Sequence, residues 1–153
     1  MSLEKNQDAP DFEALDQEGK KRSLKEFKGK WVFVYFYPMD DTPGCTKEAC
    51  SIRDEFSEIR KHAVVIGVSS DTVKSHQKFA NKYQLPFLLI SDPDKKVISD
   101  YGAKGLLFTK RISYLINPQG KIARAYLKVD PKTHATEVLA DLLALVKNFC
   151  ASF

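Results

Sequence analysis

The stretch that decides the fold is Trp31–Cys50, which reads WVFVYFYPMDDTPGCTKEAC. Its first part, Trp31–Tyr37, is apolar or aromatic throughout. A run of this kind predicts a strand that is buried on both faces and therefore lies in the centre of a sheet. A loop at residues 38–44 follows, and two cysteines come after it. Open α/β sheets bind ligands at the carboxyl ends of such strands, so we expect the functional site here.

A helix is predicted to begin within this stretch. Thr42 is a favourable N-cap residue, Pro43 suits the first helical position, and Cys45 then takes the third. Apolar residues continue at spacings of four and three, which is typical of one helix face. They are Cys45, Ala49, Ile52, Phe56 and Ile59. The alternative is that Thr-Pro-Gly forms only a turn, with proline at its second position and glycine at its third. The loop alone does not decide between the two.

A cysteine at a helix start is a candidate nucleophile. The first backbone N–H groups of a helix lack partners, and together with the helix macrodipole they favour the reactive thiolate over the thiol. Cys50 lies five residues after Cys45. In a regular helix that spacing is about 7.5 Å along the axis and puts the side chains on different faces. A disulfide requires Cα atoms roughly 4.4–6.8 Å apart, so the two thiols can bond only if the helix unwinds.

Strand-like and helix-like segments alternate along the rest of the chain. We expect strands at residues 63–68, 87–90 and 112–116, a turn at 117–120 and a returning strand at 121–127. We expect a helix capped near Ser70 or Asp71 with Val73, His76, Ala80 and Tyr83 on one face, a second from Asp92 through Tyr101, and a third from His134 to Phe149. Residues 102–110 are predicted to be an exposed loop. This order predicts an α/β fold with a central mixed β-sheet flanked by helices.

Composition narrows the class of protein. The chain has 153 residues, 43% hydrophobic and 29% charged, and we expect one domain over residues 1–153. The net charge of +4 is mild and the basic residues are scattered, so nucleic acid is not an expected partner. The densest basic run, residues 20–22, reads as a solvated strand or turn. The longest apolar stretch is too short to span a membrane, so no membrane association is expected.

The cysteine count and the amino terminus bear on the compartment. No apolar secretory signal precedes the fold, which favours the cytoplasm, although a trimmed organellar protein would look the same. Three cysteines without such a signal argue against a structural disulfide framework and for catalytic or redox use. Cys150, near the carboxyl end, is expected to be a passive, partly buried thiol.

These residues together resemble the peroxiredoxins along almost the whole chain. The active-site pattern Pro-x-x-x-Thr-x-x-Cys is present as Pro38, Thr42 and Cys45. The run GCTKEAC at residues 44–50 is similar to the bacterioferritin-comigratory, or peroxiredoxin Q, branch, whose second cysteine lies five residues on in the same helix. RISYLI, residues 111–116, is similar to the segment that carries an active-site arginine in this family. The resemblance implies a thioredoxin-like fold with an N-terminal extension. The extra Cys150 departs from the pattern.

The resemblance implies a thiol-dependent peroxidase that reduces hydrogen peroxide and organic hydroperoxides. Cys45 would become a sulfenic acid, Cys50 would resolve it as a Cys45–Cys50 disulfide, and an external dithiol would reduce that bond. Thioredoxin is the expected donor, ahead of glutaredoxin or glutathione. No cofactor or metal is implied, and this branch is often monomeric.

The resemblance also implies roles for four further side chains. Arg111 would hold the Cys45 thiolate and polarise the peroxide, since its charge is permanent and its donors are fixed. The Thr42 hydroxyl would orient the peroxide, or else only cap the helix. Pro38 would shield the pocket. Glu48, three residues after Cys45 on the same helix face, either points to solvent or pairs with Arg111 and orients it.

Two rival functions start from the same cysteines. A thioredoxin-type thiol–disulfide oxidoreductase would share the fold, but it requires Cys-x-x-Cys, and here four residues intervene. A zinc-binding module could use the Cys-x4-Cys spacing. However, His62, His76 and His134 are too dispersed to form the usual second ligand pair, and two thiols about 140° apart around a helix cannot both face one ion.

Overall fold

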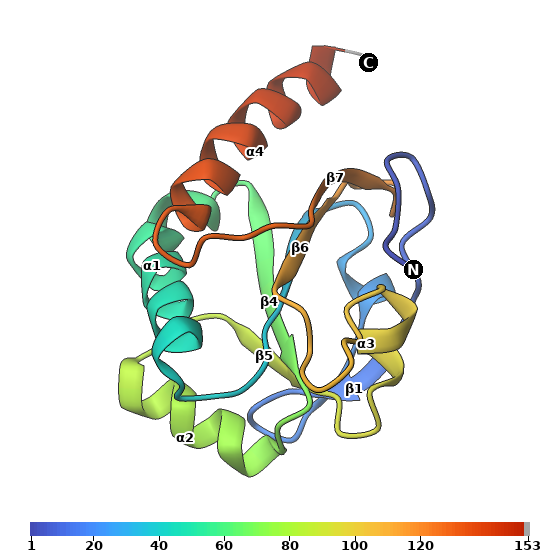
Figure 1. The fold of residues 1–153 in the computed structure, drawn as a ribbon. Helices are drawn as coiled ribbons and strands as arrows, with labels where there is room; N and C mark the ends of the chain where they lie inside the picture. The colour runs from blue at the N-terminus through green and yellow to red at the C-terminus, as the bar shows by residue number, and fades with distance from the viewer. Residues whose placement is uncertain (152–153) are drawn as a thin grey trace.

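A computed structural model describes the backbone of residues 1–151 and the side chains of residues 1–149 (Figure 1). The strands are β1 (Glu13–Leu15), β2 (Lys21–Ser23), β3 (Trp31–Phe36), β4 (Ala63–Ser69), β5 (Leu88–Ser91), β6 (Ile112–Ile116) and β7 (Ile122–Tyr126). The helices are a 3-10 turn (Leu24–Phe27), α1 (Pro43–Ile59), α2 (Val73–Tyr83), α3 (Lys96–Asp100) and α4 (His134–Ala151).

The strands form one mixed sheet in the order β2-β1-β5-β4-β3-β6-β7. β3, β4 and β5 are parallel to one another, whereas β6 and β7 join antiparallel on the other side of β3. All six residues of β3 are buried, as the uninterrupted apolar run predicts for a strand with neighbours on both sides. The mixed sheet expected from the sequence is therefore confirmed.

Side chains alternate between the two faces of β3 and divide the core in two. Phe33 and Tyr35 pack with the buried faces of α1, α2 and α4. Val34 and Phe36 pack on the opposite face with α3 and the N-terminal segment. Figure 1 shows the same layering, with α1, α2 and α4 on one side of the sheet and α3 on the other. The site described below lies on the α1 side.

Several predicted boundaries are wrong by a few residues. The helix after β4 is capped by Thr72, whose hydroxyl accepts from the backbone N–H of Ser75, and not by Ser70 or Asp71. Asp71 is engaged elsewhere, because its carboxylate accepts from the backbone N–H of Asp40. The helix predicted from Asp92 begins only after Lys95, whose left-handed backbone (φ 61°) interrupts any earlier helical run.

The N-terminal extension contains a short hairpin that periodicity did not predict. β1 and β2 pair antiparallel over three residues each, and β1 joins the sheet at β5 through a single residue pair, Leu15 with Ser91. Strands of three residues are too short to show a period of two. The run at residues 20–22 extends into β2, consistent with the solvated strand expected there.

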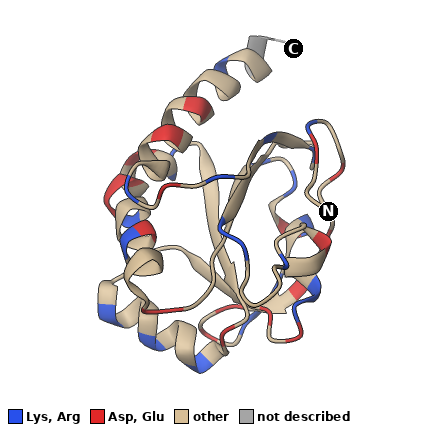
Figure 2. Ribbon diagram, in the orientation of Figure 1, with Lys and Arg blue, Asp and Glu red and all other residues tan. Residues whose placement is uncertain are grey.

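Residues of both charges are interspersed along the ribbon (Figure 2). None of the helices in the described part of the chain is long and apolar enough to cross a membrane.

Candidate active site

Cys45 occupies the third position of α1, the helix that follows β3 after the connecting residues 37–42. Thr42 is the N-cap and Pro43 begins the helix, so the helical interpretation is confirmed and the turn alternative is wrong. The backbone N–H of Thr46 donates to the carbonyl of Thr42 at 2.8 Å, which closes the first helical turn around the cysteine. Cys45 is only 1% exposed. Its thiol therefore lies at the unpartnered N–H end of a helix and is shielded from bulk water.

Strand register brings Arg111 to this thiol. Phe36, the last residue of β3, pairs with Ile112, the first residue of β6. Arg111 therefore lies directly beside the chain that leads from β3 into α1. Its guanidinium Nη2 donates to Cys45 Sγ at 3.3 Å, although the two residues are 66 positions apart.

Glu48 holds the other side of the same guanidinium. Arg111 Nη1 donates to Glu48 Oε1 at 2.7 Å, and the Glu48 side chain is 1% exposed. Of the two alternatives for Glu48, pairing with Arg111 is therefore the one adopted. Its second oxygen, Oε2, is buried and has no hydrogen-bond partner among the described residues. Burial raises the pKa of Glu48 to about 7, against the opposing pull of the Arg111 charge.

Arg111 stays cationic in this setting. Burial works against its charge, but the hydrogen bond to Cys45 and the charge of Glu48 outweigh that effect and raise the pKa of Arg111 further above its usual value. Its side chain is 21% exposed, so part of it faces solvent while two of its nitrogens contact Cys45 and Glu48. A fixed cation beside sulfur can stabilise negative charge there and on a substrate bound next to it.

Thr42, Pro38 and Cys50 lie around this centre. The Thr42 hydroxyl does not cap the helix through its side chain; it donates to the carbonyl of Met39 at 2.9 Å. Pro38 is half-buried at the end of β3. Cys50 is half-buried within α1, and both it and Cys45 are free thiols. The side chain of Cys150 lies outside the described residues.

Gly44 is a site residue that the sequence reasoning missed. A Cβ at this position would lie 3.1 Å from Arg111 Nη2. A side chain there would push the guanidinium by a few tenths of an ångström. The glycine directly before Cys45 was a visible signal, but it reads equally well as part of a turn.

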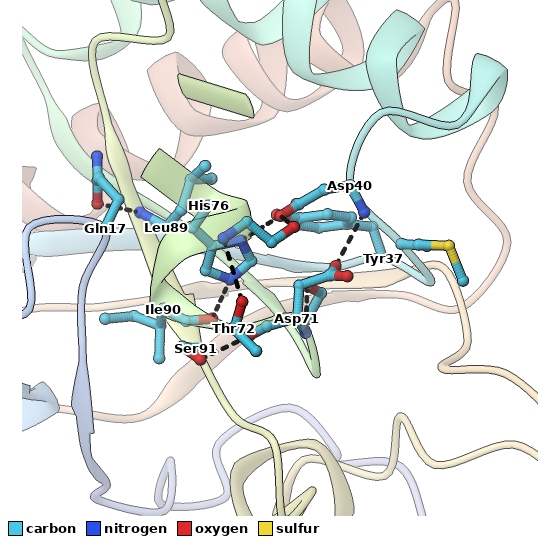
Figure 3. Close-up of polar contacts among 12 residues, drawn as sticks. Gln17, Tyr37, Asp40, Asp71, Thr72, His76, Leu89, Ile90 and Ser91 are labelled. Atoms are coloured by element: carbon cyan, nitrogen blue, oxygen red, sulfur yellow. Dashed lines mark hydrogen bonds and ion pairs between the residues drawn. The ribbon is translucent and has the colours of Figure 1, made fainter. Parts of the chain in front are cut away.

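The sequence reasoning also missed the contact between Asp40 of the active-site loop and His76 of α2. Figure 3 shows the His76 ring of α2 directed at the Asp40 carboxylate. With Asp71 they form the group among the described residues whose ligand atoms are close enough to hold a metal ion, within 4.8 Å of one another. Neither described cysteine belongs to that group. A zinc site built on Cys45 and Cys50 therefore has no support in the geometry.

Comparison with known proteins gives consistent results. The profile of the AhpC/TSA family matches residues 6–125. A Coxiella burnetii protein named peroxiredoxin bcp is 45% identical and covers 93% of this chain and 100% of its own length. The chloroplastic peroxiredoxin Q of Populus jackii is 43% identical over 94% of this chain and 70% of its own length.

Solved structures agree with these relatives. Mycobacterium tuberculosis peroxidoxin BcpB superimposes with a TM-score of 0.87 at 33% identity, covering 93% of this chain and 97% of that one. The bacterioferritin comigratory protein of Xanthomonas campestris, studied for alkyl peroxide reduction with a trapped intermediate and ligand complexes, gives a TM-score of 0.83 at 34% identity. That match covers 87% of this chain and 90% of the other.

Proposed function

The chain belongs to the AhpC/TSA family, among its peroxiredoxins of the bcp and Q type, and from this membership we infer that it is a thiol-dependent peroxidase. We propose that Cys45 is the peroxidatic residue and that its substrates are hydrogen peroxide and organic hydroperoxides. The observation that carries this assignment is the 3.3 Å contact between Arg111 Nη2 and Cys45 Sγ at the start of α1. It joins the buried thiol to a permanent cation.

In the first step, the Cys45 thiolate attacks one peroxide oxygen and the O–O bond breaks. Sulfur is oxidised to sulfenic acid, while the second oxygen leaves with the electron pair and takes a proton to become water or an alcohol. Negative charge moves from sulfur toward the leaving oxygen. Arg111 contacts the sulfur where this charge begins, and we propose that its guanidinium also stabilises the charge that develops on the leaving oxygen.

Thr42 is proposed to orient the peroxide as a hydrogen-bond acceptor. Its single hydroxyl hydrogen is directed to the Met39 carbonyl, and its lone pairs remain free to accept. An organic hydroperoxide has one O–H to donate, so this pairing fixes which of its oxygens faces Cys45; the two oxygens of hydrogen peroxide are equivalent. Pro38, which has no N–H, is proposed to cover the pocket without competing for the substrate.

In the second step, Cys50 resolves the sulfenic acid. Its thiol attacks the Cys45 sulfur, a Cys45–Cys50 disulfide forms and water leaves. Both residues lie in the regular helix α1, and a spacing of five keeps them too far apart to bond there. The proposed cycle therefore includes local unwinding of the beginning of α1.

An external dithiol closes the cycle by reducing the disulfide. Family membership supports a thiol reductant, and we propose thioredoxin, with glutaredoxin or glutathione as weaker alternatives. All proposed redox residues belong to one chain, so a monomer suffices and no bound cofactor enters any step. A cytoplasmic location remains a prediction from the sequence; relatives include a bacterial protein and chloroplastic ones.

Thioredoxin-coupled peroxide turnover with three single Cys→Ser variants tests the proposal. Cys45→Ser should abolish turnover, because no other described thiol lies at a helix start next to an arginine. Cys50→Ser should react once with peroxide and then stall with thioredoxin. Cys150→Ser serves as the matched control and should change little. Normal turnover in Cys50→Ser combined with a stall in Cys150→Ser would mean that Cys150 is the resolving residue.

A further inference from the structure

Asp40, two residues before the helix cap, is the centre of a buried polar network. Its side chain is 4% exposed. One carboxylate oxygen accepts from the Tyr37 hydroxyl at 2.6 Å, and the other accepts from the Ser75 hydroxyl at 2.8 Å and lies 2.7 Å from His76 Nδ1 (Figure 3). A buried carboxylate with three partners is held in one orientation. The loop before Cys45 is therefore fixed at this residue.

His76 connects that carboxylate to the sheet. The ring is fully buried in α2, and its Nε2 lies 2.9 Å from the carbonyl of Ile90 in β5. A carbonyl can only accept, so Nε2 carries a hydrogen and the ring cannot be flipped without losing this bond. His76 is thus a rigid link between β5 and the active-site loop.

Further contacts tie the same loop to α2 and its flanks. The backbone N–H of Asp40 donates to Asp71 at 2.9 Å. The next residue, Asp41, has a left-handed backbone (φ 59°) and accepts from Lys82 at 2.8 Å and from Tyr83 at 2.6 Å. Both residues that lead into Thr42 are therefore held by groups outside α1.

The middle of α1 is tied to α2 as well. Arg53 Nη1 donates to the backbone carbonyl of Tyr83, at the end of α2, at 2.7 Å. Cys45 and Cys50 lie between this contact and the contacts of Asp40. Contacts with α2 at Asp40 and at Arg53 therefore hold the chain on both sides of the segment that contains the two cysteines.

We propose that His76 is a positioning residue. Through Asp40 it fixes the end of the loop from which α1 unwinds, and so it sets the balance between the helical and the unwound form of the active site. This inference rests on the proposed function. In the helical form Cys45 meets Arg111 and reacts with peroxide; in the unwound form it meets Cys50. Weakening the link between His76 and Asp40 shifts the balance toward the unwound form. Attack on peroxide then slows, while disulfide formation with Cys50 becomes faster relative to the over-oxidation of Cys45 to sulfinic acid.

The arrangement of Asp40, Asp71 and His76 can be explained without a metal ion. Asp40 accepts from Tyr37 and Ser75 and contacts His76 Nδ1, Asp71 accepts from Asp40 and from Ser69, and both nitrogens of His76 have partners. A metal ion would have to replace these contacts at two buried side chains, Asp40 and His76, and one half-buried side chain, Asp71. The geometry therefore assigns the network to holding the loop.

A matched pair of substitutions separates the two bonds of His76. His76→Gln puts an amide nitrogen near the position of Nε2 and keeps the bond to Ile90, but it loses Asp40. His76→Asn puts a nitrogen near Nδ1 and keeps Asp40, but it loses Ile90. Ser75→Ala removes one donor to Asp40 at the half-buried edge of the network and is the mildest change. His62→Asn, in the turn after α1, is the control outside the network.

Two readouts fall together if the proposal holds. One lost buried hydrogen bond in His76→Gln shifts the equilibrium about fivefold toward the unwound form, so the second-order rate of Cys45 oxidation, measured in the Cys50→Ser background, should fall by up to about fivefold. With Cys50 present, the sulfinic acid formed per turnover at fixed peroxide, measured by mass spectrometry, should fall by a similar factor. Ser75→Ala should show the same pattern at about twofold, and His76→Asn should lie closer to wild type.

Other results would overturn the inference in distinguishable ways. A lower melting temperature for His76→Gln and Ser75→Ala, with unchanged sulfinic acid per turnover, would reduce the network to a purely structural role. Equal effects of His76→Gln and His76→Asn would show that the contact with Asp40 is not the one that matters. A wild-type protein that does not consume peroxide would instead remove the proposed function itself.

Discussion

At the scale of single residues, Arg111 is shared between the thiol of Cys45 and the carboxylate of Glu48. Arg111→Met keeps much of the side-chain length but removes the charge and all donors. We expect roughly hundredfold slower peroxide attack, because the cation acts on the moving charge as well as on the thiolate. Second-order rates of Cys45 oxidation, measured from neutral pH to well above the thiol's titration, check this.

High pH separates the two contributions of Arg111. Once Cys45 is fully ionised, any remaining deficit in Arg111→Met comes from lost stabilisation of the transition state. Arg60→Met, at an exposed position after α1, is the control and should match wild type. If Arg111→Met also matches wild type at high pH, the arginine serves only to favour the thiolate.

Glu48 gives the protein a pH-dependent stability of its own. Burial raises its pKa from 4.5 to about 7 in the folded state. Between these values the folded protein retains a proton that the unfolded chain has lost, so this group makes the free energy of unfolding fall as pH rises through the window. Above about pH 7 its contribution becomes constant. Glu48→Gln removes it, so the variant should gain stability relative to wild type as pH rises from 4.5 to 7.

Urea unfolding of the reduced proteins at a series of pH values measures this difference. Glu58→Gln, an exposed position on the same helix, should run parallel to wild type. Parallel curves for Glu48→Gln as well would show that the pKa of Glu48 is not raised by folding.

At the scale of elements, α1 is the helix that must change during the proposed cycle. The Cys45–Cys50 bond is incompatible with its regular geometry, so backbone hydrogen bonds from Cys45 to Arg53 have to break in the oxidised form. We expect much faster amide hydrogen exchange over that segment in the disulfide state than in the reduced state. β3 and β4 should stay protected in both, because all of β3 and most of β4 are buried.

Peptide mapping of the same sample supplies the control for that experiment, since it establishes which cysteines are joined. A confirmed Cys45–Cys50 bond with unchanged protection over α1 would contradict the unwinding. Faster exchange over β3 as well would mean that oxidation loosens the core and not only the helix.

The elements also show where sequence reasoning succeeds and where it stops. Long periodic or continuously apolar segments, such as β3 and α1, were predicted close to their observed bounds because burial dictates their pattern. The start of α2 was misplaced because Asp71, a good cap by residue type, is used to hold Asp40 instead. A competing tertiary contact of this kind leaves no local trace in the sequence.

At the scale of the whole molecule, the site depends on how distant segments meet. Arg111 reaches Cys45 through the pairing of Phe36 with Ile112, and nothing near either residue in the sequence specifies that register. Only the family resemblance pointed to Arg111. His76 was predicted as part of a buried helix face, which is correct, but its bonds to Asp40 and Ile90 depend on three elements packing together.

In the proposed cycle the sheet beneath α1 stays folded while the start of the helix opens, so each turnover includes a small folding step on an unchanged surface. Ala49 and Ile52 are fully buried in the core on this face of the sheet, so they can pack into the same positions again once the disulfide is reduced. Helix–coil relaxation in peptides takes about 0.1–1 μs. Encounters with a protein reductant, at typical association rates of about 10⁵–10⁷ M⁻¹s⁻¹ and micromolar concentration, are far slower. The pocket is therefore rebuilt long before the next redox partner arrives, and the supply of reductant, not refolding, sets the pace of recycling.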